Sequence, residues 1–102
     1  MNVIAPRAIR EFSVQYPESE VPLRTWYNNL RRQDFLNFVH LSEHFVVDVA
    51  RSKQKDTVFI FDVAGNKYRV VCYINFENQT VFIRHVLTHL EYNEWNKRGR
   101  PS

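Results

Sequence analysis

Two short segments of the sequence hold side chains that could carry out chemistry on a phosphodiester. The segment GNKYRVV supplies the cations Lys67 and Arg69, and the segment FIRHVLTHLEY supplies His89 and Tyr92. Cations stabilise the negative charge of a pentavalent phosphorane. A histidine moves protons near neutral pH, and a tyrosine can stack on a base or assist proton transfer. If these four side chains converge, the set suits phosphate chemistry.

Each of these residues also has a simpler interpretation, and the sequence leaves both open. An arginine at a strand end can be only a salt-bridge partner. A histidine at the start of a helix, like His89, is more often a surface residue than a catalyst. Tyr92 and Trp95 could simply pack the last helix onto a sheet.

The histidines and the single cysteine form no recognisable metal-binding pattern. His85 and His89 span a strand end and a helix start, so the i, i+4 geometry of a helical metal pair does not apply. His40 and His44 have helical spacing, but their segment is more typical of a solvated helix face. Cys72 lies in an apolar strand and is expected to be buried and inert. We therefore expect no metal and no cofactor.

Charge is unevenly distributed along the 102 residues. Residues 1–50 hold five Lys/Arg against six Asp/Glu, whereas residues 51–102 hold nine against five. A basic half favours an anionic partner, most commonly nucleic acid, although a solvated charged surface is the alternative. One cysteine fits a reducing compartment. The sequence has neither a secretory signal nor a membrane-length apolar run, so we expect a cytoplasmic protein with no membrane contact.

The hydrophobic pattern predicts a single α+β domain over residues 1–102. Apolar residues at helical spacing predict helices over 6–16, from Ser19 through Leu30, and over 37–45. Residues with high β-propensity predict strands over 57–63, 67–76 and 80–87, with a shorter strand at 45–50. A capping-box pattern predicts a short helix over 88–97, and the KRGRPS tail is expected to fray. The N-terminal helices would pack on one face of a small antiparallel sheet.

A hairpin between the last two long strands would bring the candidate residues together. A two- or four-residue connection near Asn78 and Gln79 predicts that Arg69 lies opposite Thr88 and that Arg84 lies opposite Tyr73. Lys67 and Arg69 would then emerge beside the start of the last helix. That helix start favours an anion, because its N–H groups and dipole point there.

The chain resembles the HigB-type toxins of bacterial type II toxin–antitoxin modules, which are mRNA interferases of the RelE superfamily. GNKYRVV at 65–71 and FIRHVLTHLEY at 82–92 carry the resemblance. VIAPRAIREF and PLRTWY stand in the family's order at the N-terminus. The resemblance covers roughly residues 3–95, and it implies a RelE-like fold.

The resemblance implies a ribosome-dependent, metal-independent endoribonuclease that cuts mRNA in the ribosomal A site. The 2′-hydroxyl would attack the adjacent phosphate and leave a 2′,3′-cyclic phosphate and a 5′-hydroxyl. A HigA-like helix-turn-helix antitoxin would neutralise the toxin, and only their complex would bind operator DNA. Carried over by position, the implied catalytic residues are Arg69, His89 and Tyr92, and the implied RNA-binding residues are Asn66, Lys67 and Arg84.

Two positions depart from the family pattern. Asn93 stands where the family usually has Asp, and Asp62 stands where we expect Asn. An acid at position 62 would add negative charge where RNA must bind, if its side chain faces the cleft. Two alternatives therefore stay open: a gyrase-directed ParE-like toxin, and a non-catalytic module that binds an antitoxin or nucleic acid.

Overall fold

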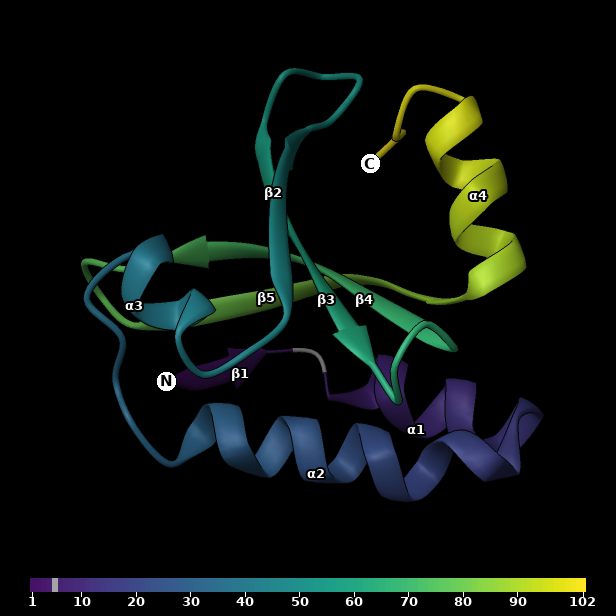
Figure 1. Cartoon of the computed structure of the whole chain (residues 1–102), viewed down its shortest axis with the longest axis horizontal. Helices are drawn as coiled ribbons and strands as arrows, with labels where there is room; N and C mark the ends of the chain where they lie inside the picture. Colours follow the sequence, from purple (N-terminus) through teal and green to yellow (C-terminus); the bar gives the residue numbers. More distant parts are fainter. Residues whose placement is uncertain (5) are drawn as a thin grey trace.

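The computed structural model describes residues 1–4 and 6–102 and confirms the α+β fold class (Figure 1). The elements run in the order β1 Asn2–Ile4, α1 Arg7–Gln15, the 3-10 helix η1 Pro17–Ser19, α2 Glu20–Arg31, α3 Phe38–Ser42, β2 Val47–Arg51, β3 Thr57–Val63, β4 Tyr68–Asn75, β5 Thr80–Thr88 and α4 His89–Lys97. No helix within the described residues is long and apolar enough to cross a membrane.

The five strands form one sheet in the order β1-β5-β4-β3-β2. Strands β2 to β5 are antiparallel to their neighbours, as the sequence predicts. Strand β1, which the sequence analysis did not predict, pairs in parallel with β5, so the sheet is mixed rather than purely antiparallel. A three-residue strand is too short to show a two-residue period, and it exists only because β5 offers a free edge.

The sheet is covered on both faces by different helices (Figure 1). Helices α1 and α2 lie on one face, where Leu23, Trp26 and Leu30 pack against Phe61 and Val70 in the main core. The opposite face, which we call the α4 face, carries a smaller cluster. That cluster consists of Val58, Ile60, Val71 and Trp95, with Ala50, Tyr73, Leu87 and Tyr92 packed around it.

Helices α4 and α2 begin in different ways. Thr88 and Glu91 form the predicted capping box at the start of α4. Ser19 does occupy the N-cap position of α2, but its side chain makes no cap. Its hydroxyl instead donates to the carbonyl oxygen of Tyr16 at 2.7 Å, because η1 folds the chain back immediately before α2.

The predicted register between β4 and β5 is wrong by one residue at Arg69 and by two at Tyr73, which pairs with Phe82 and not with Arg84. Arg69 pairs with Leu87, and Thr88 pairs with Tyr68. The register also shifts between Val71 and Cys72, which leaves Arg84 without a cross-strand partner in the pairing. Such a bulge breaks the alternation of faces along a strand. On the Arg69 side of the bulge, Val86 pairs with Val70 and packs against the main core, and His85 pairs with Val71.

The C-terminal tail is ordered by hydrogen bonds, contrary to the predicted fraying. The carbonyl oxygen of Pro101 accepts from Nε1 of Trp95 at 2.7 Å. The carbonyl oxygen of Arg100 accepts from the backbone N–H of Lys53, and Ser102 bonds to Gln54. The tail therefore joins the end of α4 to the loop between β2 and β3, which the sequence alone could not place beside it.

The aromatic centre of the main core provides a test of the fold. Phe61 is 0% exposed, and its ring lies 5.1 Å from Trp26 and 5.6 Å from Phe45 between centroids. We expect Phe61→Ala to lower the free energy of unfolding by about 3–5 kcal/mol, because it leaves a cavity. Phe82→Ala is the matched control: Phe82 is 40% exposed, so its loss should cost less than about 1.5 kcal/mol. Urea unfolding of both variants measures the difference, and equal losses would contradict this core.

Candidate active site

Arg69 is the centre of the candidate site, and it is fully engaged by its neighbours. Its side chain lies on the α4 face of β4, and the residue is only 8% exposed. The Nε atom forms an ion pair with Oδ1 of Asp62 at 2.8 Å. The Nη1 atom donates to the carbonyl oxygen of Asn66 at 3.0 Å. The guanidinium also lies over the ring of Tyr92, 4.9 Å from its centroid. The cation is thus held in place from three sides.

Asp62, which stands where the family pattern leads us to expect Asn, belongs to the candidate site. It pairs with Arg69 across the β3–β4 hairpin, so its carboxylate does face the candidate site. Burial raises the pKa of Asp62, and nearby Asp48 raises it further, while the positive charges of Arg69 and His89 lower it. Burial has the largest effect, so the pKa lies above its ordinary value despite the ion pair.

The raised pKa of Asp62 predicts how stability depends on pH. Above the ordinary pKa of 3.8, the unfolded chain loses this proton while the folded chain still retains it. The contribution of Asp62 to the free energy of unfolding is therefore complete below pH 3.8 and lost as pH rises through the raised pKa.

We expect Asp62→Asn to remove this dependence, so that the variant gains stability relative to the wild type as pH rises through that window. Urea unfolding of both proteins across a pH series measures the difference in their free energies of unfolding. A wild type that becomes more stable relative to the variant as pH rises would contradict the prediction.

His89 and Lys67 lie together at the start of α4. The backbone N–H of His89 donates to the carbonyl oxygen of Lys67 at 2.9 Å, and both side chains are exposed. The capping box formed by Thr88 and Glu91 fixes the first turn of the helix that carries His89. An exposed imidazole and an exposed ammonium therefore stand at the mouth of the site, where the positive end of the helix dipole favours an anion.

Tyr92 connects the site to the packing of α4. One side of its ring meets Arg69, and its centroid lies 6.0 Å from that of Trp95. Trp95 is buried in the cluster on the α4 face. The packing of this helix on the sheet thus sets where the Tyr92 hydroxyl lies.

Arg84 and Asn66, the two other residues with an implied RNA-binding role, lie at different distances from Arg69. Arg84, at the bulge, lies over the ring of Tyr73 at 5.0 Å, and Tyr73 donates to Oδ2 of Asp56. Arg84 thus stands apart from the cluster around Arg69. The carbonyl and side-chain oxygens of Asn66 both accept from Arg69, at 3.0 and 3.5 Å, so Asn66 orients that cation.

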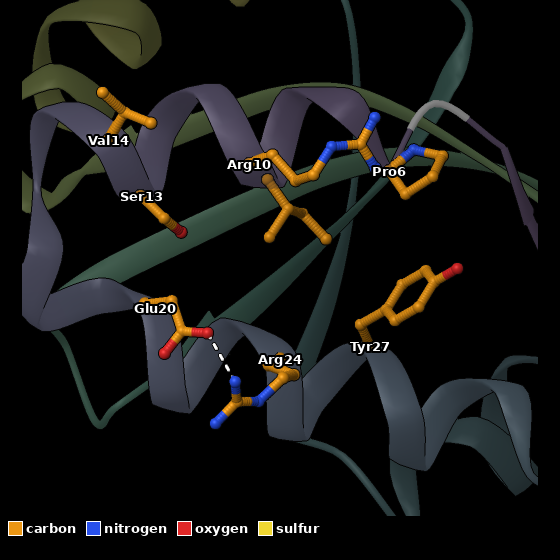
Figure 2. Close-up of a pocket in the computed structure, with 8 residues that line it drawn as sticks. Pro6, Arg10, Ser13, Val14, Glu20, Arg24 and Tyr27 are labelled. Carbon is orange, nitrogen blue, oxygen red and sulfur yellow. Dashed lines mark hydrogen bonds and ion pairs between the residues drawn. The ribbon is translucent and has the colours of Figure 1, made fainter.

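A well-formed pocket lies on the other side of the molecule from this cluster. It has a volume of about 510 Å³ and opens between α1 and α2, with Ile9, Val14 and Tyr27 among its lining residues (Figure 2). Glu20 and Arg24 neutralise each other in an ion pair at its edge. None of the predicted site residues lines it.

The described residues contain no group of three or more His, Cys, Asp or Glu side chains close enough to hold a metal ion. Cys72 is free and buried, as predicted, and burial raises the pKa of its thiol. His40 accepts a hydrogen bond from the backbone N–H of Leu36 through Nδ1, and its ring packs beside His44.

The mixed five-stranded sheet with helices on both faces is consistent with a RelE-like fold. The model of the HigB toxin family, described as the RelE-like toxic component of a toxin–antitoxin system, matches residues 19–95. The chain belongs to this family.

Two relatives match nearly the whole chain. A protein of Escherichia coli O6:H1 named mRNA interferase HigB is 29% identical over 102 residues, which is 100% of this chain and 98% of the relative. A Shigella flexneri protein with the same name is 31% identical over 93 residues, which is 91% of this chain and 88% of the relative. The family predicted from the sequence motifs is thus confirmed.

Proposed function

We propose that the chain is an endoribonuclease that cleaves mRNA as the toxin of a type II toxin–antitoxin module. The observation that carries this proposal is the cluster of Arg69, His89 and Tyr92 beside exposed Lys67 in a member of the HigB toxin family. Relatives named mRNA interferase match at least 88% of their own length. The cluster contains the groups that phosphodiester cleavage needs without a metal ion.

The proposed reaction is an internal transesterification of RNA. The 2′-hydroxyl loses its proton and attacks the adjacent phosphorus, and the bond from phosphorus to the 5′-oxygen breaks. The leaving 5′-oxygen takes up a proton, which gives a 2′,3′-cyclic phosphate and a 5′-hydroxyl. His89 is exposed at the mouth of the site and moves a proton in this scheme.

Arg69 stabilises the phosphorane in this scheme once a phosphate takes the place of the Asp62 carboxylate. Both groups are oxyanions that accept hydrogen bonds from a guanidinium, so they compete for the same donors. Tyr92 shares the face of Arg69 and stacks on a base or assists proton transfer. Lys67 and Asn66 bind the RNA backbone beside Arg69. Arg84, which stands apart from this cluster, binds the RNA backbone at a separate point.

The biological setting is proposed from the family. The toxin works as a single domain in the cytoplasm, enters the ribosomal A site and cuts mRNA there without a cofactor. A HigA-like helix-turn-helix antitoxin neutralises it, and operator DNA is bound only by the complex. The net positive charge of the C-terminal half of the chain favours association with RNA, which is negatively charged.

Primer extension on a reporter mRNA in a cell-free translation reaction tests the proposal. We expect cuts within translated codons that appear only when ribosomes are present, and 5′-hydroxyl ends on the downstream fragments. Cleavage of free mRNA without ribosomes would contradict the ribosome dependence. Growth arrest with a DNA-damage response and intact mRNA would select the gyrase-directed alternative.

One observation favours the non-catalytic alternative. The Asp62 carboxylate neutralises the cation that would hold the phosphate. A folded wild-type protein that binds its antitoxin tightly yet cuts no mRNA would select that alternative. Restored cutting in Asp62→Asn would then identify the ion pair as the cause.

A further inference from the structure

Helix α4 has two flanks of different charge. Leu90, Glu91, Glu94 and Arg98 border a pocket together with His85 and Leu87 from β5. On the other flank, His89, Asn93 and Asn96 recur at i, i+4 and i+7, so they form one stripe along the helix. Both carboxylates of α4 therefore belong to the first flank, and the stripe that begins at His89 has none.

A second, polar pocket lies at the far end of this stripe. It has a volume of about 420 Å³ and is lined by Asn93, Asn96, Lys97 and Arg100. Two amides, one ammonium and one guanidinium all offer hydrogen-bond donors, and no acid lines the pocket. Lys97 does approach Glu94 at 3.8 Å, but both side chains are exposed, so this pair restrains the ammonium little.

Arg100 lines the pocket with its backbone in a conformation that is uncommon for a non-glycine residue. Its φ angle of 59° lies in the left-handed region, which a non-glycine residue adopts at a cost. The carbonyl of Trp95 and the N–H of Lys53 bind its backbone at 3.0 Å each. Its Nε is buried and finds no hydrogen-bond partner in the part of the chain that the structure describes. These backbone hydrogen bonds fix the position of Arg100 beside the pocket that its side chain helps to line.

We propose that this pocket binds a phosphate of the RNA strand at a second position, apart from the phosphate that is cut. The proposal rests on the proposed RNA-cleaving function. Asn93 lies about 6 Å and Lys97 about 12 Å along the helix axis from His89, at 1.5 Å per residue. The pocket is thus a few nucleotides away along the same strand. Its guanidinium and amide donors match phosphate oxygens, and the contact would hold the strand in register with His89.

Two neighbouring cations on α4 offer a matched test. Lys97→Gln removes a charge from the pocket, and Arg98→Gln removes one from the other flank of the same exposed helix end. The probe is a short single-stranded RNA with 2′-O-methyl riboses, which cannot be cut. Its affinity is measured by fluorescence anisotropy between about 50 and 200 mM salt. This readout needs no catalysis.

We expect Lys97→Gln to reduce the slope of log affinity against log salt by about 0.7, the value for one contact to a single strand. Its affinity at low salt should fall about fivefold, while Arg98→Gln leaves the slope unchanged. Asn96→Asp, which adds a carboxylate to the pocket, should weaken binding further. Circular dichroism checks that all three variants are folded.

The outcomes separate this site from the proposed function. Equal slopes in Lys97→Gln and Arg98→Gln overturn the second phosphate site, even when the wild type cuts mRNA. A slope change specific to Lys97→Gln supports the site, even when the wild type cuts nothing. Unchanged RNA binding with weakened antitoxin binding in Lys97→Gln also overturns it, because the pocket would then hold an acidic protein segment.

Discussion

Replacing His89 by alanine is expected to lower the rate of mRNA cleavage about 10²–10⁴-fold, the usual contribution of a group that transfers a proton. The fold should persist, because the His89 side chain is exposed and the helix start is held by Thr88 and Glu91. The single-turnover cleavage rate on programmed ribosomes measures the effect.

His44→Ala is the control for this experiment. His44 is also an exposed histidine, but it lies beyond α3, where its ring packs against Phe35 on the other side of the sheet from α4. Its removal should leave the cleavage rate unchanged. If a folded His89→Ala variant cleaves mRNA at the wild-type rate, another group transfers the proton, and the proposed role of His89 is contradicted.

The pair formed by Arg69 and Asp62 allows stability and activity to be separated. Arg69→Gln removes the cation and leaves a half-buried carboxylate without its partner, which should lower the free energy of unfolding by about 1–3 kcal/mol. The same change should slow mRNA cleavage at least about 10²-fold, because the phosphorane loses its main cation. Urea unfolding and single-turnover cleavage measure the two effects separately.

The double variant Arg69→Gln with Asp62→Asn decides between a structural and a functional role for Arg69. It replaces both charges by amides of similar shape, so most of the lost stability should return. Cleavage should remain slow, because no guanidinium is present. The single variant Asp62→Asn should bind RNA more tightly than the wild type, because the carboxylate no longer competes with phosphate for Arg69. Recovery of cleavage in the double variant would show that Arg69 matters only for folding.

The candidate site was partly predictable from the sequence. The segments with Arg69, His89 and Tyr92 carry the chemistry and the family motif, and the hairpin places them at one end of the sheet. The partner of Arg69 was not predicted, although Asp62 and Arg69 flank the turn between two strands, and such spacing is the signal that pairs residues across a hairpin. Whether the Arg69 guanidinium is free or paired depends on burial and on tertiary contacts, which the sequence does not show.

By itself, the sequence determined the type of almost every element and the family. Helix caps, apolar spacing and β-branched runs act over a few residues, so they can be read without the fold. Only the tertiary structure decided the bulge beside Arg84, the parallel strand β1, the ion pair of Arg69 and the docking of Arg100 against Lys53. Each of these depends on contacts between segments far apart in the chain, or on a one-residue shift in register that local propensity does not specify.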